Sequence, residues 1–164
     1  MSRAFVKEAD DKAPEDFPER AVSDHPNFVT ARGLQLIEEA IRELERERDQ
    51  AKLADDTATL ARINRDLRYW QQRKASAKLV TPEASPTKVR FGVIVTLSIE
   101  DGSERSFTLV GEDEADPQSG LLSWTSPVAQ ALFGRETGDD IVLQGSKAEI
   151  VRIAAPIPSP YGRA

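Results

Sequence analysis

The chain has 164 residues, of which 39% are hydrophobic and 30% charged, and its formal net charge is −6. This composition is typical of a soluble protein with one ordinary domain or two small ones, and no apolar run approaches the roughly 20 residues that span a bilayer. The absence of cysteine excludes disulfides, iron–sulfur clusters and thiol nucleophiles, and the single histidine, His25, argues against a Ser-His-Asp triad or a His-rich metal site. We therefore expect no enzyme, no metal and no cofactor. Because the first eight residues lack the apolar core of a signal peptide, we expect a cytoplasmic location.

The N-terminal segment, residues 1–28, combines Pro14, Pro18 and Pro26 with acidic side chains and scattered apolar positions. Such a segment cannot bury enough apolar surface to form a core, so we expect a flexible, extended arm. A short peptide that docks on a partner is the alternative.

Residues 29–80 carry two heptad-like stripes, with spacings of three and four residues. Thr30 is expected to cap the first helix, whose stripe is Leu34, Ile37, Ile41, Leu44, Arg48 and Ala51. After a break at Asp55 and Asp56, the second stripe is Leu60, Ile63, Leu67, Trp70, Lys74 and Ala77. Two matching stripes with so short a link predict an antiparallel hairpin of helices 31–53 and 58–78. We expect the turn near Asp55, an aspartate cap on the second helix, and a largely buried Trp70.

The other faces of the second helix are basic, with Arg62, Arg65, Arg68, Arg73, Lys74 and Lys78 against Asp66 alone. Solvation and pairing with the Glu-rich first helix explain most such faces. Contact with a polyanion or an acidic protein is the alternative.

Two prolines in residues 81–87 stop the helix and mark a linker. Beyond it the apolar period falls to two, and turn signals separate short apolar runs. We expect a mostly antiparallel β domain over 88–155 and a flexible tail over 156–164, which makes an α+β fold. The predicted strands are 89–99, 106–110, 121–124, 141–143 and 148–153, with one short helix at 127–133 capped by Ser126.

Several motifs occur in a characteristic order along the chain. Thr30-Ala31-Arg32-Gly33-Leu34 opens the hairpin, V-x-F-G-x-x-V-x-L begins at Val89, V-G-E-D-E-A-D-P spans 110–117 and S-P-V-A spans 126–129. This order resembles bacterial transcription elongation factors of the GreA/GreB family, and the resemblance covers residues 29–153.

The resemblance implies an FKBP-like C-terminal domain that docks on RNA polymerase and a hairpin that enters its secondary channel. In the family the polymerase is the enzyme, so the factor is not catalytic and contacts nucleic acid only indirectly. No membrane partner is implied, and we expect a monomer. The residues that match the family's polymerase-binding loops are Asp113, Glu114, Asp116, Thr125, Ser126 and Pro127. A helix cap at Ser126 and a solvated acidic turn are the purely structural explanation.

The hairpin tip departs from the family. Members that stimulate transcript cleavage by helping to hold a magnesium ion carry a signature resembling D-L-[SK]-E-N-A-[ED]-Y, where this chain has Leu53-Ala54-Asp55-Asp56-Thr57-Ala58. Each arm is also about nine residues shorter, or roughly 13 Å less reach, whereas a magnesium ligand must approach within ~2 Å. We therefore interpret Asp55 and Asp56 at the tip as a helix cap, in a short-hairpin member that binds polymerase without stimulating cleavage.

Two functions from other classes remain open. An FKBP-like chaperone or peptidyl-prolyl isomerase needs an aromatic-lined pocket, whereas most of the expected ordered aromatic residues hold core-like positions: Phe91, Phe107, Trp124 and Phe133. A coiled-coil homodimer scaffold would need apolar stripes on the helices that are too wide to be covered within a two-helix hairpin. Tyr69, which widens the stripe beside Trp70, is the one sign of such a width.

Overall fold

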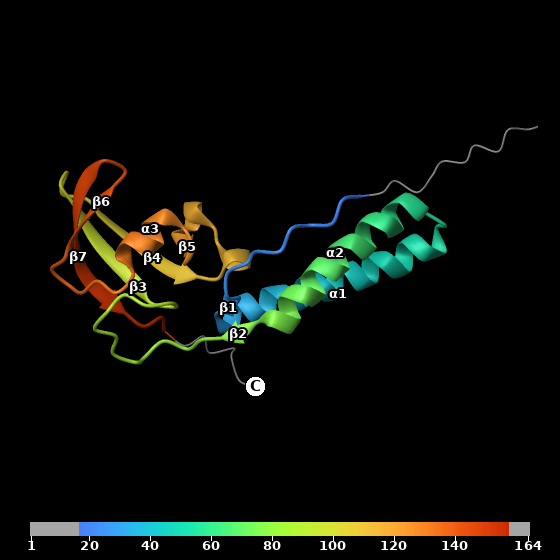
Figure 1. The fold of residues 1–164 in the computed structure, drawn as a ribbon, viewed down its shortest axis with the longest axis horizontal. Helices are drawn as coiled ribbons and strands as arrows, with labels where there is room; N and C mark the ends of the chain where they lie inside the picture. The colour runs from blue at the N-terminus through green and yellow to red at the C-terminus, as the bar shows by residue number, and fades with distance from the viewer. Residues whose placement is uncertain (1–16, 158–164) are drawn as a thin grey trace, which may run out of the picture.

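The chain folds into a helical hairpin at one end and a β domain at the other, joined by an extended linker (Figure 1). The computed structural model describes residues 17–157. Two long helices followed by a curled sheet confirm the predicted α+β class. The expected arm is described only from residue 17 and the expected tail only to residue 157, so the remaining parts of both lie outside the described residues.

The hairpin consists of α1 (Ala31–Leu53) and α2 (Thr57–Ser76), as the two stripes predict. Ile37 and Ile63 are fully buried between the helices, and Leu67 is nearly so. Thr30 caps α1 by accepting a hydrogen bond from the amide of Gly33. The seam therefore rests on a few aliphatic side chains spread along the two helices.

Trp70 is partly buried, and it is less enclosed than the neighbouring seam residues Ile63 and Leu67. The most enclosed side chain in the last two turns of α2 is Arg73, which is 1% exposed and had been assigned to the basic outer face. Lys74, a predicted seam position, is exposed and pairs with Glu38. The reason is that the last turns of α2 pack against the β domain as well as α1, so their buried face rotates away from the heptad stripe.

The base of the hairpin is closed by two short strands that the sequence pattern did not predict. β1 (Phe28–Val29) and β2 (Lys78–Leu79) pair in parallel, immediately before α1 and after α2. Asn27 is 4% exposed, and its side-chain amide donates to the carbonyl oxygen of Arg73 at 2.7 Å. The two ends of the hairpin are thereby tied to each other.

The β domain is a five-stranded sheet in the order β5-β4-β3-β7-β6. The pair β4–β5 is parallel and the other pairs are antiparallel. The short helix α3 (Pro127–Leu132) contributes the buried Ala129 and Leu132 to the core of the domain. The strands are β3 (Ile94–Ile99), β4 (Glu104–Val110), β5 (Leu121–Ser123), β6 (Asp140–Leu143) and β7 (Ser146–Ala154).

The first predicted strand of the domain is shorter than expected, because residues 89–93 are not part of it. Gly92 adopts a left-handed backbone conformation, with φ of +84°, and ends a turn before β3 begins. A side chain at this position would also approach Pro82 of the linker, since an added Cβ would lie 3.2 Å from its Cδ. Gly92 thus lets the linker pass close to the sheet.

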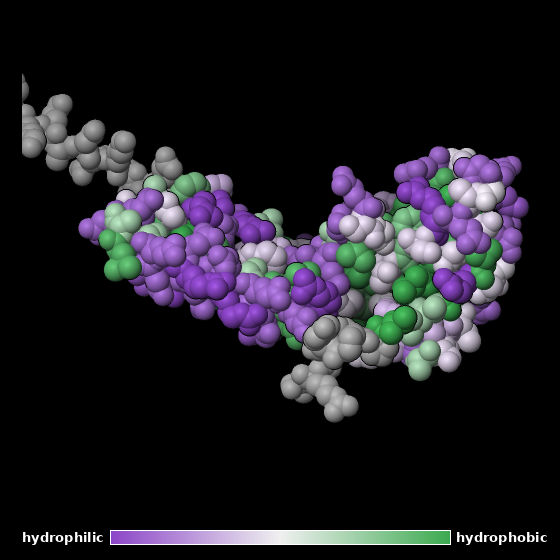
Figure 2. Space-filling model, turned by 180° about the vertical axis from the view of Figure 1, so that it is seen from behind, coloured by the Kyte–Doolittle hydropathy of each residue, from purple (hydrophilic) through white to green (hydrophobic). Residues whose placement is uncertain are grey.

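The two halves of the molecule differ in surface character. Figure 2 shows a largely hydrophilic hairpin and more apolar patches on the β domain. Within residues 17–157, no helix is both long enough and apolar enough to cross a membrane.

Candidate functional site

The tip of the hairpin is a three-residue turn in which Asp56 caps α2. One carboxylate oxygen of Asp56 accepts from the amide of Thr59 at 3.0 Å, and the other accepts from its hydroxyl at 2.6 Å. These hydrogen bonds lower the pKa of Asp56. The predicted aspartate cap is therefore Asp56, and both of its oxygens are already engaged within the chain.

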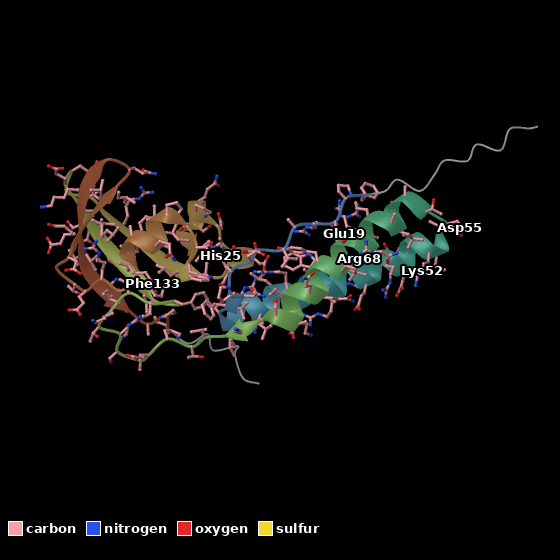
Figure 3. The ribbon with its side chains drawn as sticks, in the orientation of Figure 1. Glu19, His25, Lys52, Asp55, Arg68 and Phe133 are labelled. Carbon is pink, nitrogen blue, oxygen red and sulfur yellow. The ribbon has the colours of Figure 1, made fainter. Side chains whose placement is uncertain are left out.

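Asp55 lies at the outermost point of the turn, with a φ of +51° and an exposed side chain. Figure 3 places it at the free end of the hairpin beside Lys52. Leu53 is 91% exposed at the same end. Within the described residues the tip thus presents one carboxylate, that of Asp55, that makes neither an ion pair nor a side-chain hydrogen bond, together with an uncovered leucine.

The tip residues do not fit a magnesium site that this chain could build alone. Among residues 17–157 no group of three His, Cys, Asp or Glu side chains is arranged to hold a metal ion. Divalent magnesium requires oxygen ligands at about 2 Å in near-octahedral geometry, and the oxygens of Asp56 are committed to Thr59. Asp55 makes no side-chain hydrogen bond within the described residues and could turn toward a metal supplied by another molecule, whereas coordination by Asp56 would compete with its cap on α2.

The acidic loop at the other end of the hairpin forms the interface between the two halves of the molecule. Its short 3-10 turn, Glu112–Glu114, places Asp113 against α2. A carboxylate oxygen of Asp113 accepts from Nε of Arg73 at 2.5 Å, and the other accepts from the hydroxyl of Tyr69 at 2.7 Å. The Arg73 side chain is 2% exposed and that of Asp113 is 10% exposed, so the ion pair is buried.

Glu114 and Glu112 extend the same interface. Glu114 accepts a hydrogen bond from the hydroxyl of Thr30, and Glu112 lies 3.6 Å from an Nη atom of Arg73. Asp113 and Glu114 were predicted as polymerase-binding residues, and the structural alternative was a solvated turn. The structure shows a third role, which neither the prediction nor its alternative included: both carboxylates hold the hairpin on the β domain.

Tyr69 has a perturbed environment at this interface. Burial raises the pKa of its phenol, and the hydrogen bond to the Asp113 carboxylate raises it further. Both effects favour the neutral, donating form of the hydroxyl. Tyr69 and Arg73 are the functional residues that the sequence patterns missed, since nothing local connects either one to a loop some 40 residues away.

The remaining predicted site residues lie on the outer side of the acidic loop. Ser126 caps α3 by accepting from the amide of Ala129 at 3.3 Å, and Pro127 is exposed. The hydroxyl of Thr125 approaches a carboxylate oxygen of Glu112 at 3.5 Å, which brings the loop before α3 next to the acidic loop. Asp116 is exposed beyond them. We refer to Asp116, Thr125, Ser126 and Pro127 as the outer face.

His25, the single histidine of the chain, is exposed. Its ring stands edge-on to that of Trp124, with 6.0 Å between centroids (labelled in Figure 3).

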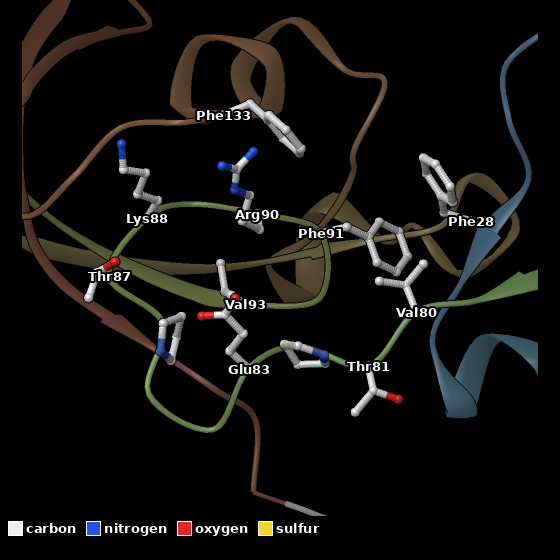
Figure 4. A pocket seen from close by; sticks show the side chains of 12 residues that line it. Phe28, Val80, Thr81, Glu83, Thr87, Lys88, Arg90, Phe91, Val93 and Phe133 are labelled. Atoms are coloured by element: carbon white, nitrogen blue, oxygen red, sulfur yellow. The ribbon is translucent and has the colours of Figure 1, made fainter.

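A groove of about 580 Å³ separates the linker from the β domain (Figure 4). Phe28, Phe91 and Phe133 contribute aromatic rings to its wall, and Val80 and Pro82 of the linker side complete it. The aromatic residues of the β domain are thus less confined to the core than the sequence suggested, because Phe133 is 38% exposed beside this groove.

Comparison with known proteins places the chain among transcription factors. Residues 83–155 match the family model described as "Transcription elongation factor, GreA/GreB, C-term". The chain is 35% identical over 117 residues to transcription elongation factor GreA of Nitratidesulfovibrio vulgaris. This alignment covers 68% of this chain and 72% of that protein. It is 30% identical over 142 residues to GreB of Yersinia pestis, which covers 75% and 83% respectively.

Among solved structures, the GreA/GreB factor of Nitrosomonas europaea is 23% identical, with coverage of 77% of this chain and 98% of that one and a TM-score of 0.39.

Proposed function

Because the chain belongs to the GreA/GreB family of transcription elongation factors, we propose that it binds RNA polymerase through its β domain, places its short hairpin at the secondary channel, and does not stimulate transcript cleavage. Such a factor acts in the cytoplasm with the polymerase and carries no catalytic site of its own. Regulation then comes from occupancy of the channel.

The observation that carries the absence of cleavage is the geometry of the tip. A carboxylate supports a second magnesium ion only if it can coordinate the ion or a water bound to it. Asp56 uses both oxygens to cap α2, so metal coordination there would weaken the cap, and Asp55 is the carboxylate at the end of the hairpin that makes no hydrogen bond within the described residues. One acidic side chain next to an exposed leucine favours contact with a protein wall over metal delivery.

The length of the hairpin supports the same conclusion. α1 has 23 residues and α2 has 20, so the longer arm spans about 34 Å at ~1.5 Å per residue. Side-chain rotation cannot compensate for an arm that ends roughly 13 Å early, as the family resemblance implies for this chain. We infer that the tip stays short of the polymerase active centre.

The proposed docking surface is the outer face. Asp116 and Pro127 are exposed there, and Ser126 holds the first turn of α3 in place. Asp113 and Glu114 support this surface from behind, because their contacts with Arg73 and Thr30 fix the hairpin at a defined position relative to the β domain. A polymerase docked on the outer face would therefore meet a hairpin that points in one direction.

The groove in Figure 4 favours one alternative function, peptidyl-prolyl isomerase or chaperone activity, because its aromatic wall could hold a proline side chain. Acceleration of prolyl isomerisation in a short peptide, abolished by Phe133→Ala, would support that alternative. We expect no acceleration, since Pro82 and Pro86 of the chain's own linker already line the groove.

Binding to purified core RNA polymerase, measured by co-elution of the full chain with the polymerase, tests the proposal at its first step. We expect a stable complex that Asp116→Lys weakens. Failure of the folded protein to associate with polymerase would reject the proposed function.

A further inference from the structure

The N-terminal segment packs along the second helix of the hairpin. Residues 17–25, which we call the N-terminal strap, follow α2 in Figure 1, and Glu19 and Arg68 lie side by side in Figure 3. Nε of Arg68 donates to Glu19 at 3.0 Å, and the guanidinium of Arg20 stacks 3.8 Å from the centroid of the Tyr69 ring. The arm expected from the sequence is thus extended over its described residues, but it is not detached from the hairpin.

The downstream end of the strap is firmly anchored. Asn27 is buried, its side chain donates to the carbonyl of Arg73, and its own carbonyl accepts from the amide of Lys78 at 2.8 Å. The β1–β2 pairing follows at once. This end can move only if the base of the hairpin opens.

The strap itself is held differently. Between residues 17–25 and α2 the described chain contains no main-chain hydrogen bond, and Pro18 and Pro26 have no amide proton to donate. Residues 18–21 are exposed, and the contacts of this part are made by side chains alone: Phe17 with Arg65, Glu19 with Arg68, and Arg20 with Asp66 and Tyr69. Exposed ion pairs stabilise little, so this part can detach while Asn27 stays in place. Pro26 lies between the anchored Asn27 and the loosely held strap, so we place the hinge there.

The surface under the strap differs from the rest of the hairpin. Tyr69 and Trp70 form an edge-on aromatic pair with 5.1 Å between centroids, and Arg65 and Arg68 precede it on the same helix. Glu19 neutralises Arg68, while the ring of Phe17 lies 5.4 Å from the guanidinium carbon of Arg65. Release of the strap would uncover more of the Tyr69 and Trp70 rings and would free the guanidinium groups of Arg65 and Arg68 from Phe17 and Glu19.

We propose that the N-terminal strap is an autoinhibitory cover, hinged at Pro26, that closes over this face of α2 in the free protein and must open before the hairpin enters the polymerase. This inference rests on the proposed function. The closed strap adds a third chain to the width of the hairpin and occupies side chains that could contact the channel wall. The apparent affinity for polymerase is then reduced by the fraction of molecules in which the strap is open.

The closed position can be measured without polymerase. Because the chain has no cysteine, spin labels at Ala21→Cys and Gln71→Cys, both exposed, report the distance between strap and α2 alone. We expect one short, narrow distance distribution. It should become long and broad when Glu19→Lys and Arg20→Ala are added. In a separate variant that keeps Arg20, the charge exchange Glu19→Arg/Arg68→Glu should retain the short distance, because the ion pair is preserved with its charges reversed. A broad distribution in the parent protein, or no change in the Glu19→Lys/Arg20→Ala variant, would overturn the proposal.

The inhibitory effect is then measured as affinity of the full chain for core polymerase. Glu19→Lys/Arg20→Ala should bind about five- to tenfold more tightly than the parent, if weak surface contacts keep the strap mostly closed. The matched control is Asp24→Asn, which changes the net charge by the same one unit but removes no described contact with α2. Equal gains in variant and control, or unchanged or weaker binding of the variant, would contradict the cover. If the parent and the variants all fail to bind polymerase, the proposed function fails as well. If the parent binds but Glu19→Lys/Arg20→Ala binds no more tightly, only the autoinhibitory cover is rejected.

Discussion

The hydroxyl of Thr30 joins the start of α1 to the acidic loop, because it accepts from the amide of Gly33 at 2.9 Å and donates to a carboxylate oxygen of Glu114 at 2.5 Å. Gly33 makes room for this arrangement, since a Cβ there would lie 2.8 Å from the same Glu114 oxygen. One side chain thus caps a helix and ties the hairpin to the β domain.

Replacement of Thr30 by valine removes both hydrogen bonds while it keeps the shape of the side chain. We expect a loss of roughly 2.5–4 kcal/mol in the free energy of unfolding, because a helix cap contributes about 1 kcal/mol and a hydrogen bond to a charged group about 1.5–3 kcal/mol. Urea unfolding measures this. Thr30→Ser keeps the hydroxyl and should retain most of the stability, and equal losses in the two variants would argue against the double role.

The Arg73–Asp113 pair predicts a much larger effect than an exposed ion pair on the same helix. Arg73→Met leaves the buried Asp113 carboxylate without its cation and should cost about 3–5 kcal/mol. Lys74→Met breaks the exposed pair with Glu38 and should cost under about 1 kcal/mol. Addition of Asp113→Asn to Arg73→Met should recover part of the loss, which a double-mutant cycle measures. Similar costs for the Arg73 and Lys74 variants would show that the interface is not held by this pair.

The raised pKa of Tyr69 predicts a pH dependence in the alkaline range. Burial and the hydrogen bond to Asp113 favour the neutral phenol, so its contribution to stability is complete below the ordinary tyrosine pKa of about 10. That contribution is lost as the pH rises through the higher pKa of the folded state. Stability should therefore fall more steeply above pH 10 in the parent than in Tyr69→Phe. Parallel pH profiles for the two proteins would contradict the buried hydrogen bond.

The outer face predicts which substitutions weaken polymerase binding without unfolding the protein. Asp116→Lys combined with Pro127→Ala should raise the dissociation constant about tenfold, because one change reverses a charge and the other alters the first turn of α3. Glu104→Lys, an exposed charge reversal at the start of β4, serves as the control. Circular dichroism should show that both variants are folded. A folded double variant with the affinity of the parent would exclude this surface. Asp113 is unsuitable for such a test, since its loss also releases Arg73.

Much of the fold follows from local patterns. The spacing of Ile37 and Ile63 with their neighbours predicts the hairpin, and Thr30, Asp56 and Ser126 are caps recognisable from residue type and position. These features depend on interactions within about four residues, which a sequence displays directly.

The interface could not be predicted in the same way. Arg73 looks like any arginine on a basic helix face, and its burial depends on Asp113, which is 40 residues away. The β1–β2 pair is two residues long and carries no alternating pattern. The strap was expected to be detached because its apolar content is low, yet it binds α2 through Glu19 and Arg20, which use charge and ring contacts instead of burial.

The proposal that the protein does not stimulate cleavage is tested most directly on a stalled, backtracked elongation complex with labelled RNA. The parent protein should remain bound to the complex while the transcript shortens no faster than with polymerase alone, and a family member that carries the cleavage signature serves as the positive control. Asp55→Asn and Asp56→Ser, the second of which keeps a helix cap, provide the matched variants. Rapid shortening by the parent protein that is lost in these two variants would show that the tip does reach the active centre and would contradict the account.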